Sequence, residues 1–268
     1  MLELIQITND PAFARRCDAL DGMRLFVDLE RLGKAERQAG RNTFISTHEI
    51  ADVGRIKSQL QRAQLMVRVN PLHAGTRREV QSVVDAGADL LMLPMFDNAS
   101  QLRDFAGIVE GRVPVVPLLE TGAALESLDE WIGTPGLGEV FLGLNDLHLS
   151  LGHRFMFEAL ALGMVDRVAT AASRQGLRFG FGGIARLDEG MLPGRDVLAE
   201  HLRLGSRSVI LSRTFHRASS EVRFEDEVLS LRKAERELAA RNPEQVEADR
   251  QRIADSIRRV SAAGRDPP

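Results

Sequence analysis

The chain has 268 residues, of which 44% are hydrophobic and 27% are charged, and its formal net charge is -3 at pH 7. This composition is typical of a globular protein, and the length suits an α/β barrel, which commonly runs to about 250 residues as one domain. The small negative charge gives no electrostatic reason to expect nucleic acid or an anionic membrane as a partner.

The N-terminal stretch MLELIQITND carries a six-residue apolar run and no basic region. We therefore expect neither a signal peptide nor a membrane span, and a cytoplasmic location. Cys17 is the single cysteine, which excludes an internal disulfide and a thiolate zinc site. Its setting in AFARRCDAL predicts that it packs within a helix.

Short apolar runs rich in β-branched residues recur along the chain, with turn residues between them. Most of the intervals have helical spacing, as in TRREVQSVVDAGA, where Val80, Val83 and Val84 share a face. Strands of this kind alternating with helices predict a parallel sheet covered on both sides, and eight of them favour a closed (β/α)8 TIM barrel over an open sheet. The eight runs are LELIQIT, MRLFVDL, QLMVRVN, DLLMLPM, VPVVPLL, EVFLGLN, LRFGFGG and RSVILSR.

Two features of this pattern leave alternatives open. The alternation of strands and helices does not by itself establish closure of the sheet. Within RNTFISTHEIADVGRIKSQL, the run TFIS is either a further short strand or part of a long loop that leads into a helix.

The composition changes after residue 217, where the chain becomes rich in charge and keeps apolar residues at helical spacing. Asn242-Pro243 breaks this pattern, so we expect two helices outside the barrel. We divide the chain into a barrel domain (1–217) and a C-terminal helical extension (218–268). The extension is either a solvated tail or, as we favour, a contact between subunits of a homo-oligomer, because several of its apolar residues need cover. These residues are Val222, Phe224, Val228, Leu229 and Leu231.

Two carboxylates follow neighbouring strands at the end of a barrel where active sites form. Glu120 follows VPVVPLL, and Asp146 follows VFLGLN one strand later. Adjacent strands lie about 4.8 Å apart, so the two carboxylates need either a shared proton or a cation. A hard divalent ion, Mg2+ or Mn2+, is the simpler solution. In the alternative interpretation, Asp146 or Asn145 caps the next helix and Glu120 pairs with an arginine.

Arg68, in LMVRVNP, places a positive charge at the end of the third strand. A guanidinium there can bind a carboxylate through two hydrogen bonds or stabilise a developing enolate. Its alternative role is a salt bridge to one of the acids at the strand ends. Gly182 and Gly183, in FGFGGIAR, either leave room for a ligand or turn backbone amides toward it.

The chain has three lysines, Lys34, Lys57 and Lys233, which we place in a loop, a helix and the C-terminal extension. No predicted strand carries a lysine, whereas a Schiff-base aldolase needs one. Carbonyl chemistry in this barrel would therefore use a metal ion as the electron sink.

The motifs VDLE, VRVNP, GADLLMLPMFDNASQL, PLLET and GLNDLHLSLG, in this order, resemble the HpcH/HpaI aldolase and citrate lyase β-subunit family of phosphoenolpyruvate/pyruvate-type barrels. The resemblance covers roughly residues 23 to 152 and continues more weakly to about residue 215. It implies a barrel in which Glu120 and Asp146 hold Mg2+ or another divalent ion and Arg68 contacts a pyruvate-like 2-oxo acid. It also implies cleavage or formation of a carbon-carbon bond with an aldehyde, and assembly through C-terminal helices.

The chain departs from this family at the second strand. Citrate-lyase-like members read DLEDAV there, whereas this chain reads DLERLG, and the catalytic histidine of the pyruvate aldolases also falls where Arg31 or Leu32 stands. His48, in ISTHEI, can supply the missing base, since an ordinary imidazole pKa of about 6.5 suits proton transfer near neutrality. His148 either reaches the pocket or caps a helix.

The sequence therefore predicts a metal-dependent aldolase. Two alternatives remain: a citrate-lyase-like enzyme acting on an acyl-CoA thioester, and a barrel that binds a 2-oxo acid without catalysing a reaction.

Overall fold

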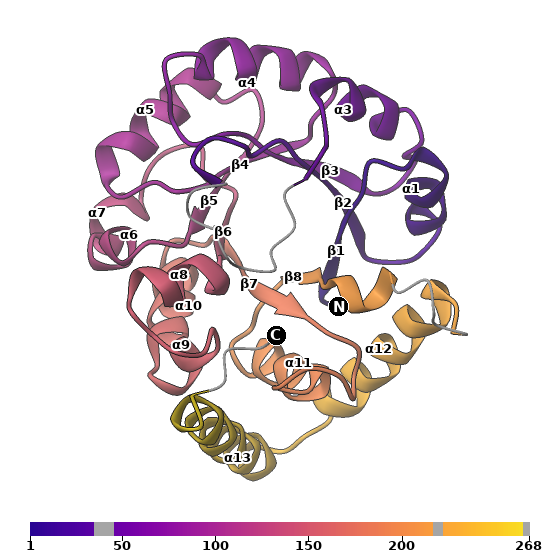
Figure 1. Cartoon of the computed structure of the whole chain (residues 1–268), viewed down its shortest axis with the longest axis vertical. Coiled ribbons are helices and arrows are strands. Elements are labelled where there is room, and N and C mark those ends of the chain that lie inside the picture. The colour runs from indigo at the N-terminus through magenta and orange to yellow at the C-terminus, as the bar shows by residue number, and fades with distance from the viewer. Residues whose placement is uncertain (35–45, 217–221, 265–268) are drawn as a thin grey trace.

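The computed structural model describes residues 1–34, 46–216 and 222–264. Its centre is a closed barrel of parallel strands in chain order, in which the first strand pairs with the last (Figure 1). The predicted (β/α)8 barrel is thus confirmed, and each strand lies within its predicted apolar run except the seventh, which ends one residue later, at Ile184. The strands are β1 (Glu3–Ile7), β2 (Met23–Asp28), β3 (Gln64–Arg68), β4 (Leu90–Leu93), β5 (Val115–Leu119), β6 (Glu139–Leu142), β7 (Arg178–Ile184) and β8 (Ser208–Leu211).

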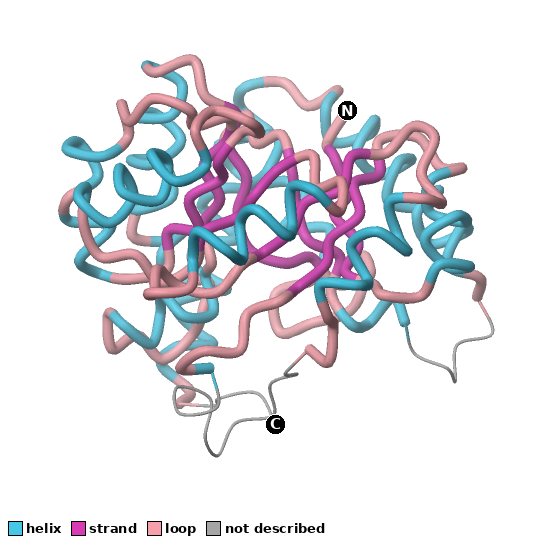
Figure 2. Tube along the Cα trace, turned by 90° about the horizontal axis from the view of Figure 1, so that it is seen from above, coloured by secondary structure: helices cyan, strands magenta, loops and turns pink. Residues whose placement is uncertain are grey.

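Helices surround the barrel, and Figure 2 shows them on both sides of the strands. The helix predicted from Val80, Val83 and Val84 is present, with Val80 and Val83 fully buried. The run TFIS lies almost entirely outside the described residues. The helices up to residue 216 are α1 (Pro11–Asp18), α3 (Ile50–Lys57), α4 (Thr76–Asp85), α5 (Ala99–Val109), α6 (Gly122–Glu126), α7 (Leu128–Trp131), α8 (Leu144–Ser150), α9 (Glu158–Ala161), α10 (Met164–Arg174), α11 (Gly194–Arg203) and the 3-10 helix η1 (Arg213–His216).

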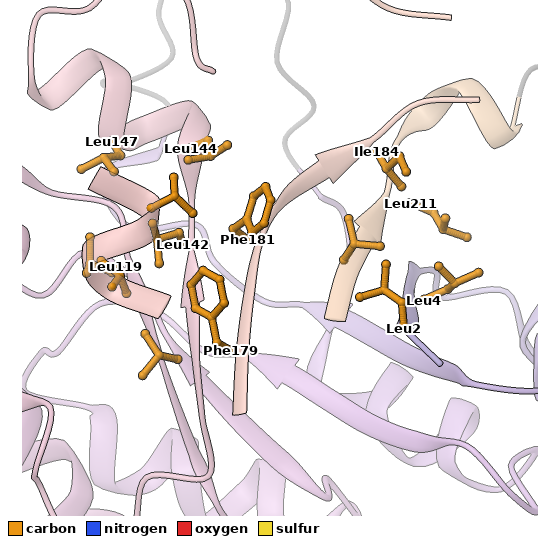
Figure 3. Close-up of a cluster of buried hydrophobic side chains, with 14 of the residues drawn as sticks. Leu2, Leu4, Leu119, Leu142, Leu144, Leu147, Phe179, Phe181, Ile184 and Leu211 are labelled. Carbon is orange, nitrogen blue, oxygen red and sulfur yellow. The ribbon is translucent and has the colours of Figure 1, made fainter. Parts of the chain in front are cut away.

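The strands are largely apolar because both of their faces are buried. One face fills the barrel interior, where Phe26, Met66, Met92, Leu118 and Phe141 form a separate cluster. The other face packs against the surrounding helices and forms the larger cluster, part of which Figure 3 shows around β5 to β8. This burial on both sides accounts for the near-continuous apolar runs in the sequence.

The C-terminal extension forms two helices, as predicted: α12 (Phe224–Ala239) and α13 (Pro243–Ala262). Asn242 caps α13 by accepting a hydrogen bond from the backbone N–H of Gln245. Helix α12 packs against α11, and α13 packs against α9 and α11. Within the described ranges, no helix combines the length and the apolar character needed to cross a membrane.

The apolar residues of this extension find much of their cover within the chain itself. Phe224, Val228 and Leu231 are buried, and the Phe224 ring lies edge-on to Phe13 of α1, with centroids 4.9 Å apart. Leu229 and Val222 stay exposed. Three of the five residues therefore give no reason to expect a partner subunit, and a homo-oligomer remains a prediction.

Candidate active site

The carboxyl ends of the strands open onto a cavity of about 800 Å³. Phe26, Met92, Leu118, Phe141 and Ile210 give it an apolar floor. The structure brings all the residues that we predicted for the site to the wall of this one cavity: His48, Arg68, Glu120, Asp146, Gly182 and Gly183.

Two of the cations that line the cavity, Lys34 and Arg68, lie on the β2 and β3 side, where Asp28 ends β2 and Arg68 ends β3. Two parallel hydrogen bonds of 2.8 Å join the Arg68 guanidinium to the Asp28 carboxylate. Arg68 also lies 3.3 Å from Glu30. Burial favours the neutral form of Asp28, but the charges and hydrogen bonds of Arg68 and Lys34 outweigh it and lower the pKa of Asp28. The salt bridge considered as the alternative role of Arg68 is thus present, while its side chain keeps a partly exposed face on the cavity.

Lys34 also lies at this site, although the sequence predicted only that it stands in a loop. Its Nζ atom lies 2.9 Å from Asp28 Oδ2 and 3.4 Å from Glu30 Oε2, and its side chain is almost completely buried on the cavity wall. No described barrel strand carries a lysine, as predicted. A lysine nevertheless reaches the site from outside the strands, because the chain after β2 brings Lys34 back to Asp28. A cation four residues after Glu30 was the only signal in the sequence.

Glu120 and Asp146 lie on the β5 and β6 side of the cavity. Glu120 Oε1 accepts a hydrogen bond of 3.0 Å from the backbone N–H of Met95. Burial raises the pKa of Glu120 to about 8, and the negative charge of Asp146 contributes in the same direction. At Gly143, a Cβ atom would lie 2.8 Å from Glu120 Oε2, so the absence of a side chain there makes room for this carboxylate.

Asp146 stands in the first turn of α8 and caps nothing there. The N-cap of this helix is Gly143, with no side-chain cap, and Asn145 is exposed, so the capping alternative is wrong. In the described part of the chain, Asp146 Oδ1 is a buried oxygen without a hydrogen-bond partner. A buried acceptor of this kind is costly unless something binds it.

This pair of carboxylates fits a hard divalent cation. No group of three or more His, Cys, Asp or Glu side chains in the described residues is arranged to hold a metal. Mg2+ does not need such a cage, since it commonly binds through one or two carboxylates and completes its octahedron with water and substrate oxygens. Such an ion would bind the Oδ1 atom of Asp146, which has no hydrogen-bond partner among the described residues. It would also favour the ionised form of Glu120, which burial disfavours.

His48 lies on the cavity wall just before α3. Its Nδ1 atom accepts a hydrogen bond of 3.1 Å from the backbone N–H of Asp28. Arg31, the residue that breaks the family motif, donates a hydrogen bond of 3.0 Å to the His48 carbonyl. His148 does not line the cavity, since it lies on α8 with its Nδ1 3.2 Å from the Leu144 carbonyl oxygen.

The two glycines lie at the end of β7. Gly182 has a φ of +52°, a conformation that favours glycine, and the pairing of β7 with β8 shifts register between Gly180 and Gly183. The irregular strand end leaves Gly182 and Gly183 on the cavity wall. Contact with a substrate there remains a prediction.

A closed (β/α)8 barrel with charged side chains gathered in a cavity at the carboxyl ends of its strands has the architecture of a TIM-barrel enzyme. Residues 9–181 match the model of a family described as HpcH/HpaI aldolase/citrate lyase, and the chain belongs to this family. It is a family of aldolases and lyases, which the motifs of the sequence had indicated.

Two curated relatives and one solved structure illustrate these similarities. A hydroxypyruvate/pyruvate aldolase of Roseovarius nubinhibens is 26% identical over 67% of this chain and 82% of its own length. A (3S)-malyl-CoA thioesterase of Cereibacter sphaeroides is 28% identical over 52% of this chain, but the match spans only 46% of that protein. The citrate lyase beta subunit of M. tuberculosis, complexed with oxaloacetate and magnesium, shares the fold with a TM-score of 0.60 at 18% identity, over 88% of this chain and 97% of that one.

Proposed function

We propose that the protein is a divalent-metal-dependent carbon-carbon lyase that cleaves or forms a bond between a pyruvate-like 2-oxo acid and an aldehyde. The observation that carries this proposal is the pair of carboxyl groups, Glu120 and Asp146, for which the described residues provide no ion pair on the β5 and β6 side of the cavity. Mg2+ or Mn2+ is the cation that this pair would hold.

The charged groups at and after the ends of β2, β3, β5 and β6 do not balance one another, although Asp10, Arg16 and Arg213 also line the cavity. We define the cavity cluster as Asp28, Glu30, Lys34, Arg68, Glu120 and Asp146, which sets four carboxylates against two cations. Lys34 and Arg68 are engaged with Asp28 and Glu30, so the two excess carboxyl groups are Glu120 and Asp146. Because burial raises the pKa of Glu120 to about 8, this pair carries its full charge of two only when a cation favours the ionised form of Glu120. One divalent cation would neutralise this excess.

Each part of the cavity has a role in such a reaction. Glu120 and Asp146 would hold the metal ion, which would act as a Lewis acid and lower the energy of the enolate of the 2-oxo acid. Arg68, held in place by Asp28, offers its guanidinium to the substrate carboxylate or to the enolate oxygen. The floor around Phe26, Leu118 and Phe141 keeps water away from the reacting carbon atoms. His48 and the strand-end glycines Gly182 and Gly183 complete the proposed site.

The relatives support this choice of substrate. The Roseovarius protein, which matches the larger share of this chain, is named for pyruvate and hydroxypyruvate, both 2-oxo acids. The M. tuberculosis structure contains another 2-oxo acid, oxaloacetate, together with magnesium. A thioester lyase is less well supported, because the guanidinium of Arg31, a basic group that could otherwise meet a phosphate of an acyl-CoA, donates a hydrogen bond to the His48 carbonyl.

The test is exchange of the methyl protons of pyruvate for deuterium, followed by NMR after chelation and again with Mg2+ or Mn2+ restored. We expect exchange only with the metal, and a loss of at least about 100-fold in Asp146→Asn, because the variant loses a ligand of the ion that stabilises the enolate. Asp129→Asn on α7 is the matched control, since the Asp129 carboxylate is exposed and does not line the cavity.

Three results would overturn the proposal. Exchange that persists unchanged in Asp146→Asn removes the metal pair from the chemistry. Pyruvate binding without any exchange, measured by calorimetry on the same sample, favours the barrel without catalysis. Release of coenzyme A from an acyl-CoA without pyruvate exchange favours the thioester lyase.

A further inference from the structure

The main chain on both sides of His48 is held in place by polar contacts. The backbone N–H of His48 donates to Ser46 Oγ at 3.1 Å, and its carbonyl accepts from Arg31 at 3.0 Å. The ring is buried apart from a small face on the cavity, with only 6% of the residue exposed. These contacts fix the direction in which the imidazole points.

The hydrogen bond from Asp28 determines which ring nitrogen carries the proton. A backbone N–H can only donate, so Nδ1 of His48 must accept with its lone pair. A neutral imidazole has one such lone pair and one N–H, which places the hydrogen on Nε2. A proton on Nδ1 would face the Asp28 N–H with no acceptor between them.

The surroundings of the ring also favour its neutral form. Asp28, Asp52 and Lys34 are the charged groups that act on it, the two carboxylates against the lysine. Burial outweighs the two carboxylates and lowers the pKa of His48 below its usual value. The ring can therefore offer a donor to the cavity at neutral pH, but it has no free lone pair with which to take up a proton.

We propose that His48 serves the reaction as a neutral hydrogen-bond donor, through Nε2–H, to an oxygen of the bound substrate. This role replaces the general base that the sequence suggested, and it rests on the proposed function. A fixed donor aimed at an oxygen that gains negative charge contributes about 100-fold or more to a rate. The acceptor of the substrate proton is then a carboxylate facing the cavity or a water molecule held by one.

Glutamine at position 48 separates the two roles. Its Oε1 can accept from the Asp28 N–H while its Nε2 donates to the cavity, but it cannot act as a base. In the pyruvate exchange assay with Mg2+, we expect His48→Gln to keep kcat within about tenfold of wild type and His48→Ala to lose about 100-fold. His148→Gln is the matched control, since that histidine does not line the cavity. A His48→Gln variant as slow as His48→Ala, with the acidic limb of the pH profile abolished, would show that His48 is the base.

Nitrogen-15 NMR of histidine-labelled protein tests the same role without turnover, with the His48 signals assigned by their loss in His48→Gln. We expect Nδ1 to remain unprotonated and Nε2 protonated at pH 7, and the Nε2 proton to shift downfield when oxalate is added with Mg2+. An imidazolium, or a proton on Nδ1 with oxalate bound, would overturn the proposal. The tautomer is measurable even if pyruvate exchange fails, so failure of the proposed function and failure of this role are distinct results.

Discussion

A buried group of charges lies at each end of the barrel. We define the basal cluster, at the N-terminal ends of the strands, as Glu3, Arg24, Glu139, Arg178 and Ser208. Arg24, only 1% exposed, lies 2.8 Å from Glu139 and also pairs with Glu3, and Arg178 lies 2.9 Å from Glu3. The Ser208 hydroxyl donates to the other oxygen of Glu139. Two carboxylates meet two guanidinium groups here, whereas the cavity cluster has twice as many carboxylates as cations.

This difference in charge balance indicates that the basal cluster stabilises the fold, whereas the cavity cluster can bind a ligand. In the basal cluster each carboxylate already has cationic partners, so it offers nothing to a ligand and its charges stabilise the fold only as long as all are present. In the cavity cluster burial raises the pKa of Glu120 to about 8, and Asp146 Oδ1 has no hydrogen-bond partner among the described residues, so both carboxyl groups can accept a cation. Perturbed groups of this kind gather at functional sites.

The largest effect that we expect is from Glu139→Gln in the basal cluster. The substitution removes one of the two carboxylate partners of the buried Arg24 and leaves only Glu3, and breaking a buried pair in this way costs about 3 kcal/mol of unfolding free energy. Urea unfolding measures it. Glu110→Gln is the matched control, because its pair with Arg77 is exposed on both sides and is worth less than about 1 kcal/mol. Equal losses in the two variants would mean that the basal cluster has no special role.

A smaller effect concerns acid sensitivity behind β7. His201 of α11 is fully buried, lies flat on Phe181 with centroids 3.7 Å apart, and has its Nδ1 2.8 Å from Ser206 Oγ. Burial lowers the pKa of His201 to about 3 from 6.5. Below pH 6.5 the imidazole of His201 therefore binds a proton in the unfolded chain but not in the folded protein. The free energy of unfolding consequently falls as the pH decreases from 6.5 toward 3.

At pH 5 this loss amounts to about 2 kcal/mol relative to pH 7.5. His201→Phe should show a correspondingly smaller difference in unfolding free energy between the two pH values, whatever its absolute stability. Ser206 Oγ keeps acceptors in the carbonyls of Phe179 and Ser208, so the variant leaves no unpaired hydroxyl. A pH dependence identical to wild type would show that His201 is not the acid-sensitive group.

The sequence predicted most of the charged residues at the carboxyl ends of the strands but none of the basal cluster. Glu120, Asp146 and Arg68 were identified because each directly follows an apolar strand, and parallel strands bring such positions to one edge. Lys34 was missed because it reaches Asp28 only through the path of a loop, which no periodicity describes. The basal cluster was missed because Arg24 and Glu139 stand within or beside apolar runs, and their pairing, 115 residues apart, depends on closure of the barrel.

The matched substitution in the cavity cluster, Glu120→Gln, should have the opposite sign to Glu139→Gln and a smaller size. Burial and the charge of Asp146 make the Glu120 carboxylate unfavourable without a cation, so the metal-free variant should be more stable than wild type by about 1 kcal/mol. The Met95 N–H keeps its acceptor in the amide oxygen. Wild type should gain about 2.7 kcal/mol from Mg2+ at 100 times its Kd, and the variant much less. Thermal unfolding with and without Mg2+ measures both quantities, and two glutamine variants that destabilise the metal-free protein alike would erase the distinction between the two ends of the barrel.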